Sequence, residues 1–156
     1  MAKELDVGDP APDFALPTDG GGHARLADFK GKAVVLYFYP KDDTSGCTAE
    51  AIAFSGLKPE FDAAGALVFG VSPDSAASHD KFKKKHGLAV ALAADPQRGA
   101  IEAYGVCREK SMYGRKYFGV ERSTFLIGRD GRIAKIWRKV KVPGHAAEVL
   151  AAAKAL

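Results

Sequence analysis

The chain has 156 residues, 47% hydrophobic and 27% charged, a composition typical of a folded globular protein and unlike that of a disordered one. Its net charge of +4 is too weak to indicate nucleic-acid binding by itself, and its apolar runs are far shorter than the ~20 residues of a membrane-spanning helix. The N-terminus lacks the apolar stretch of a secretory signal, and two cysteines are too few for a disulfide framework, so we expect a reducing, cytoplasmic location.

The first predicted elements are a buried strand and a helix. The stretch Lys32–Tyr39 is rich in β-branched and aromatic residues and stops at Pro40, which is typical of a strand buried on both faces. Cys47 then opens a helical segment with apolar residues three and four positions apart: Phe54, Leu57 and Phe61. Pro59 lies inside this segment, so we expect a kink or a break there.

The rest of the chain alternates strands and helices before it ends in a hairpin and a helix. Ser75 can cap a helix that starts at about Ala76 and ends at His86, before Gly87. The other predicted elements are strands at Ala66–Val71 and Val90–Ala93, a short helix begun by Asp95 and Pro96 and ended at Gly105, a long polar loop at Gly105–Gly119, strands at Ser123–Ile127 and Ile133–Trp137, and a final helix after Pro143 and Gly144.

This order of elements predicts an α/β fold with a mixed central sheet. Strands joined by helices pair in parallel, whereas strands joined by a tight turn pair antiparallel. A mixed sheet with helices on both faces follows, and the thioredoxin-like arrangement is the commonest fold with this order. No repeat or linker divides the chain, so we expect residues 1–156 to form one domain.

The segment from Pro40 to Glu50 is the candidate site. It joins the end of a buried strand to a helix, where sites of open α/β sheets lie. Cys47 falls in the first helical turn, whose free backbone N–H groups favour a thiolate. A nucleophile there also needs a cation from elsewhere in the fold, and Arg122, at the start of the penultimate strand, is the candidate. The alternative for either cysteine, and the favoured one for Cys107, is a buried core thiol.

The run Tyr37–Glu50 (YFYPKDDTSGCTAE) resembles the peroxidatic motif of the peroxiredoxins, of the AhpC/TSA type, and most closely that of the bacterioferritin comigratory protein or peroxiredoxin Q group. Three further stretches match: Gly8–Leu16, Val71–Asp74 and Glu109–Leu126. The resemblance extends from about residue 4 to the C-terminus. It implies a thiol-dependent peroxidase that reduces hydrogen peroxide and organic hydroperoxides, an antioxidant role in cell redox homeostasis, and no metal, haem or flavin.

The resemblance also implies a role for each residue of the site. Cys47 would attack the terminal oxygen of the hydroperoxide and become a sulfenic acid, and Thr44 would hydrogen-bond both the peroxide and the sulfur. Arg122 would stabilise the thiolate and polarise the O–O bond. Pro40 would shield the site from water, and Glu50 would orient the arginine.

Two departures from the family pattern affect the mechanism. Ser45 stands where the family usually has proline. The resolving cysteine that many members carry five residues after the peroxidatic one is Ile52 here, and Phe82–Lys85, where other members carry it, has none. Only Cys107 remains, so we expect an external thiol, such as thioredoxin, glutaredoxin or a small thiol, to reduce the sulfenic acid. An internal disulfide between Cys47 and Cys107 stays open as the alternative.

Other interpretations of the sequence are weaker. A thiol–disulfide oxidoreductase normally needs a Cys-x-x-Cys pair, and Thr44 occupies the first cysteine position. A non-catalytic binding or chaperone module of the same fold is a further alternative. The basic run Lys81–His86 is interpreted as a solvated helix face and not as a nucleic-acid site. His79 and His86 are too far apart along one helix for a shared metal ion. We expect a monomer, as is common in this branch of the family.

Overall fold

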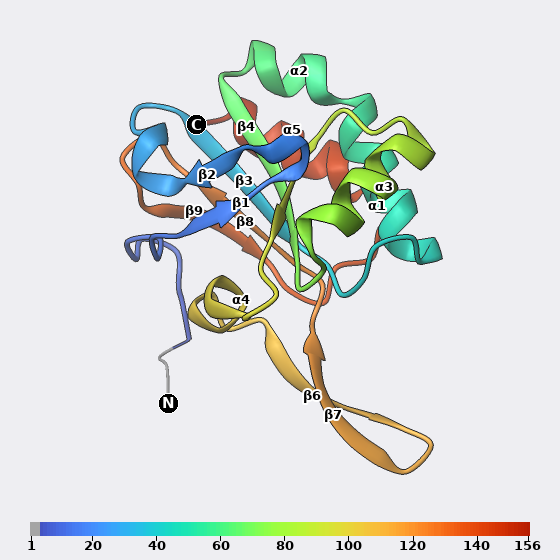
Figure 1. The fold of residues 1–156 in the computed structure, drawn as a ribbon. Coiled ribbons are helices and arrows are strands. Elements are labelled where there is room, and N and C mark those ends of the chain that lie inside the picture. The colour runs from blue at the N-terminus through green and yellow to red at the C-terminus, as the bar shows by residue number, and fades with distance from the viewer. Residues whose placement is uncertain (1–3) are drawn as a thin grey trace.

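The computed structural model describes residues 4–156, which fold around a five-stranded sheet (Figure 1). Residues 1–3, part of the stretch considered for a secretory signal, lie outside the described residues. The sheet contains β3 (Ala33–Phe38), β4 (Ala66–Ser72), β5 (Ala91–Ala94), β8 (Ser123–Ile127) and β9 (Ile133–Trp137). The α-helices are α1 (Ser45–Gly56), α2 (Lys58–Ala63), α3 (Ala76–His86), α4 (Gly99–Ala103) and α5 (His145–Lys154). The remaining elements are β1 (Ala15–Pro17), η1 (Asp19–Gly21), β2 (His23–Arg25), η2 (Leu26–Phe29), β6 (Cys107–Met112) and β7 (Arg115–Val120).

The sheet is mixed, as the sequence predicts, with the strand order β5-β4-β3-β8-β9. β3, β4 and β5 pair in parallel because helices connect them, whereas β8 pairs antiparallel with both β3 and β9. β3 therefore has neighbours on both sides and layers on both faces, which is why all six of its residues are buried.

Separate hydrophobic cores cover the two faces of the sheet. Side chains alternate along β3, so Ala33, Val35 and Tyr37 enter one core, and Val34, Leu36 and Phe38 enter the other. Residues of α1, α2, α3 and α5 complete the first core, and residues of α4 and the N-terminal segment complete the second. Helices on both faces are therefore confirmed.

The helical segment after Cys47 breaks next to Pro59, as predicted. α1 ends at Gly56 and α2 starts at Lys58, and Leu57 between them leaves the helical conformation at φ −100° and ψ 2°. Pro59 lies in the first turn of α2, where its missing N–H has no partner to lose. The proline therefore begins a new helix instead of bending a continuous one.

The predicted loop at Gly105–Gly119 is wrong, because most of it forms the β6–β7 hairpin, which projects from the body of the molecule (Figure 1). Tyr113 and Gly114 form its turn with φ of 52° and 77°, the left-handed conformation that tight hairpin turns require. The hairpin is mostly exposed, so it lacks the alternation of apolar and polar residues by which a half-buried strand is recognised.

The predicted start of the short helix at Asp95 also needs correction. α4 starts at Gly99, and Arg98 before it adopts a left-handed φ of 64°. Asp95 still caps the helix from a distance, because its carboxylate accepts the N–H of Ile101 at 2.8 Å. The sequence therefore identified the capping residue but placed the helix too early.

The remaining predicted elements lie close to their expected positions. α3 starts at Ala76, where the Ser75 side chain accepts the N–H of Ser78, and it ends before Gly87 in a left-handed conformation. The β1–β2 hairpin was not predicted. In residues 4–156, no helix combines the length and the apolar character that crossing a membrane requires.

Candidate active site

Cys47 lies where the loop that follows β3 enters α1. It is the third residue of this helix and is 1% exposed, so it lies in the first turn of α1 and inside one of the two cores. The prediction that Cys47 opens a helix is confirmed.

Arg122 reaches this sulfur from the position directly before β8. Its Nη2 atom lies 3.3 Å from Sγ of Cys47, and its Nη1 atom donates to Oε1 of Glu50 at 2.6 Å. The pairing of β3 with β8 explains this meeting, because Phe38 lies opposite Ser123 and Arg122 therefore lies beside the loop that leaves β3. Cys47, Glu50 and Arg122, which the sequence singles out, thus form one contiguous group, although Arg122 lies 72 positions after Glu50.

Glu50 is almost fully buried, which changes its acidity. Burial raises the pKa of Glu50 from its ordinary value of 4.5 to about 7, and the charge of Arg122 only partly opposes this effect. Among the described residues, its Oε2 atom has no hydrogen-bond partner, which makes the carboxylate form costly. Burial acts against the charge of Arg122 too, but Glu50 and Cys47 outweigh it and hold the pKa of Arg122 above its ordinary value.

Thr44 and Pro40 belong to the loop before α1. Thr44 has the extended backbone of a helix N-cap, yet its hydroxyl donates to the carbonyl oxygen of Lys41 at 2.9 Å. The expected hydrogen bond from Thr44 to the sulfur of Cys47 is not among the contacts of the described residues and stays a prediction. Pro40 is half-buried and follows Tyr39, the first residue after β3.

The structure does not bring Cys107 to this group. Both cysteines are free thiols, and Cys107 is half-buried at the start of β6. It packs against the core on the opposite face of the sheet from the core that contains Cys47. Its neighbour is Arg98, whose Nη1 atom lies 3.8 Å from the Cys107 sulfur.

Sequence reasoning missed the side chains that hold the loop before Cys47. His79 and Asp42 form a buried pair with 2.7 Å between Nδ1 and Oδ2. Asp43, at φ 61°, pairs with Lys85 at 2.6 Å and with His86 at 2.8 Å. The available signal is the pair of histidines on one helix with two consecutive aspartates in the loop, whereas the sequence analysis interprets the histidines only as possible ligands of a shared metal.

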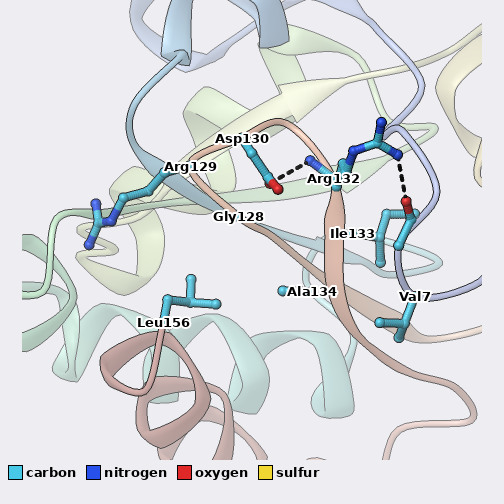
Figure 2. A pocket seen from close by; sticks show the side chains of 9 residues that line it. Val7, Gly128, Arg129, Asp130, Arg132, Ile133, Ala134 and Leu156 are labelled. Carbon is cyan, nitrogen blue, oxygen red and sulfur yellow. Dashed lines mark hydrogen bonds between the residues drawn. The ribbon is translucent and has the colours of Figure 1, made fainter.

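A hollow of about 440 Å³ lies elsewhere (Figure 2). It surrounds the turn between β8 and β9, where Arg132 donates to Gly8 O at 2.9 Å, and Ile133 and Leu156 add apolar surface. Because β8 runs antiparallel to β3, this turn lies at the opposite end of the sheet from Cys47. The cysteine chemistry and this hollow are therefore separate.

Comparisons with known proteins agree with this geometry. The family model described as the AhpC/TSA family matches residues 7–136. A putative peroxiredoxin bcp of Coxiella burnetii is 49% identical over 94% of this chain and 97% of its own length, and peroxiredoxin Bcp of Bacillus subtilis is 49% identical over 94% and 93%.

Solved structures of similar proteins have the same fold. Peroxiredoxin Q of Xanthomonas campestris superposes with a TM-score of 0.89 at 48% identity, covering 97% of this chain and 96% of that one. A structure of the bacterioferritin comigratory protein of the same organism, studied for alkyl peroxide reduction through a trapped intermediate/ligand complex, matches with a TM-score of 0.89 at 47% identity and the same coverage. The thioredoxin-like arrangement expected from the order of elements is thereby confirmed.

Proposed function

This chain belongs to the AhpC/TSA family and is a peroxiredoxin, a thiol-dependent peroxidase, and we propose that it reduces hydroperoxides at the sulfur of Cys47. The contact that carries this proposal is the 3.3 Å approach of Arg122 Nη2 to Cys47 Sγ at the start of α1. The Cys47 thiolate attacks the terminal peroxide oxygen, the O–O bond breaks, and the leaving oxygen takes a proton to become an alcohol or water. The sulfur is oxidised to a sulfenic acid while the peroxide is reduced.

Arg122 stabilises charge on both sides of this step. Its guanidinium faces the sulfur that carries the negative charge before attack, and the departing oxygen gains charge as the O–O bond breaks. A fixed cation in a water-poor site is a strong stabiliser of such charge. Glu50 holds the other end of the guanidinium at 2.6 Å and thereby fixes its direction.

Thr44 and Pro40 prepare the peroxide side of the site. The Thr44 hydroxyl donates its hydrogen bond to Lys41 O, so its oxygen can still accept a hydrogen bond from the O–H of a peroxide. Pro40 has no N–H and presents a half-buried ring between β3 and the loop, which limits the access of water.

An external thiol is the reductant in this proposal. Because the two cysteines pack against opposite faces of the sheet, an internal disulfide to Cys107 requires a large movement of the chain. We therefore assign the reduction of the sulfenic acid to thioredoxin, glutaredoxin or a small thiol. The proposal also includes a monomeric state, the absence of a metal or organic cofactor, and a cytoplasmic location, which two free thiols favour.

The two cysteines supply a matched test. Peroxide consumption is measured with dithiothreitol as reductant for Cys47→Ser and for Cys107→Ser. We expect no turnover from the first variant and turnover near that of the unaltered protein from the second. Turnover by Cys47→Ser would refute the assigned nucleophile, and a Cys47–Cys107 linked peptide in the mass spectrum of peroxide-treated protein would refute the external reductant.

The same measurement separates the alternatives. A non-catalytic module consumes at most one equivalent of peroxide, and a thiol–disulfide oxidoreductase reduces disulfides instead of peroxides. The peroxiredoxin relatives do not favour either alternative.

A further inference from the structure

A buried network joins the loop before Cys47 to helix α3. The Asp42 carboxylate accepts three hydrogen bonds: from Tyr39 Oη at 2.6 Å, from Ser78 Oγ at 2.8 Å and from His79 Nδ1 at 2.7 Å. The side chains of Asp42 and His79 are 4% and 0% exposed. A loop that leads to the reactive cysteine is thus tied to a helix more than thirty positions further along the chain.

The contacts of His79 indicate an ion pair. Its Nδ1 atom faces Asp42, and its Nε2 atom lies 3.0 Å from the carbonyl oxygen of Ala93 in β5. Both neighbours are acceptors, and only the charged imidazolium has two N–H groups to donate. Although burial raises the pKa of Asp42, the hydrogen bonds from His79 and Tyr39 outweigh it and hold that pKa below its ordinary value.

Stability alone does not explain this pair. The desolvation of two buried charges offsets most of their attraction, and apolar residues of similar volume often serve the fold as well. What the pair provides is a defined position for the loop, because both partners are held by further hydrogen bonds.

The anchored Asp42 side chain and the neighbouring Asp74 together hold one particular peptide unit of the loop. The N–H of Asp42 donates to Asp74 Oδ2 at 2.8 Å, and the carbonyl of Lys41, in the same planar peptide, accepts the Thr44 hydroxyl at 2.9 Å. Because this peptide is rigid, the contacts on its Asp42 side determine where the Lys41 carbonyl points. The direction of that carbonyl in turn decides how the Thr44 oxygen faces the site.

We propose that Asp42 and His79 are positioning residues for peroxide reduction, because they fix the Lys41–Asp42 peptide that orients the Thr44 hydroxyl. This inference rests on the proposed function, in which Thr44 receives the peroxide. Among the described residues, neither side chain has a hydrogen bond to Cys47 or Arg122, so we assign their effect to the position of Thr44 and not to the ionisation of Cys47.

A metal site is the competing interpretation of the same group. Ligand atoms of Asp42, Asp74 and His79 lie within 4.8 Å of one another. Each already has protein partners, however: both nitrogens of His79 and both oxygens of Asp42 are hydrogen-bonded, and Asp74 Oδ2 also accepts Ser72 Oγ at 2.7 Å. The nitrogens of His79 and the oxygens of Asp42 therefore already have protein partners, and the proposal does not need a metal.

The test measures two reactions of Cys47 at the same pH: oxidation by hydrogen peroxide in stopped flow and alkylation by iodoacetamide. We expect Asp42→Ala to slow oxidation 10- to 100-fold, about the loss caused by displacing a catalytic group by 1 Å, with alkylation unchanged or faster. Ser78→Ala removes one of the three hydrogen bonds to Asp42, and alanine is a favourable residue in a helix such as α3. This variant should slow oxidation a few-fold. Asp42→Asn should recover much of the rate, because the amide can donate to a neutral His79.

Lys83→Ala is the matched control, because it removes a 2.7 Å ion pair to Asp19 from the same helix without touching the loop. Its oxidation rate should equal that of the unaltered protein. If Asp42→Ala does not fold, Ser78→Ala and Asp42→Asn decide the question.

Equal slowing of both reactions, or no slowing of oxidation, would overturn the positioning role. So would a rate that falls with EDTA and returns with Zn²⁺ or Mn²⁺, because the group would then bind a metal. These failures leave the proposed function standing, which fails separately if Cys47→Ser retains turnover.

Discussion

Glu50→Gln changes how the stability of the protein depends on pH. Glu50 has its ordinary pKa of 4.5 in the unfolded chain and a pKa of about 7 in the fold, so between these values the folded protein holds a proton that the unfolded chain has released. Its contribution is therefore fully present below pH 4.5 and is lost as pH rises through about 7. The difference between the two pKa values corresponds to about 3 kcal/mol. Glutamine still accepts the Arg122 hydrogen bond but does not titrate, so the variant lacks this loss.

The assay is urea unfolding at pH 4 and pH 8, followed by the fluorescence of the single tryptophan. The free energy of unfolding of Glu50→Gln, relative to the unaltered protein, should rise by about 3 kcal/mol from the lower to the higher pH. Glu60→Gln, at an exposed position of α2, is the control and should show the same difference at both pH values. If the difference in the free energy of unfolding between Glu50→Gln and the unaltered protein is also the same at both pH values, burial does not raise the pKa of Glu50.

Three other substitutions test single contacts, two at the site and one in the core. Arg122→Ala removes a charge-assisted hydrogen bond to Cys47 that is worth about 1.5–3 kcal/mol. The rate of oxidation in stopped flow should therefore fall about 10- to 100-fold. A loss under about threefold would contradict the role of the guanidinium. Gly46→Ala puts a Cβ 3.1 Å from Nη2 of Arg122 while it favours the helix by up to about 1 kcal/mol, so oxidation should slow although urea stability holds or rises. An unchanged rate would count against that contact. Gly70→Ala puts a Cβ 2.6 Å from the Tyr37 ring and should lower the free energy of unfolding by about 1–3 kcal/mol, and an unaltered urea midpoint would contradict this packing.

Much of the site was predictable from the sequence because its central part is local. The strand that ends before Pro40 and the helix that holds Cys47 are adjacent in the chain, and their residue preferences and boundary residues are strong signals. Arg122 was singled out as a cation from elsewhere in the fold, but its contact with the sulfur depends on the antiparallel register of β8 with β3. The assignment of residues 1–156 to one domain stays a prediction.

The errors have physical causes as well. The sequence predicts a loop where the β6–β7 hairpin lies, because exposed strands have no buried face and therefore no alternation of apolar and polar residues. The short helix starts at Gly99 and not at Asp95 because Arg98, directly before it, takes a left-handed φ of 64° that no residue type in the segment indicates.

The amino-acid sequence alone determined the order of the five central strands, the mixed character of their sheet and the position of Cys47 at a helix start, because each follows from short segments of the chain and the connections between them. Only the tertiary structure decided that Glu50 is buried without a full set of partners, that Cys107 lies across the sheet from Cys47, and that Asp42 meets His79. Those facts depend on which surfaces strand pairing and helix packing bring together. The burial of a charge, or a hydrogen bond between residues far apart in the chain, produces no pattern that can be recognised in the sequence.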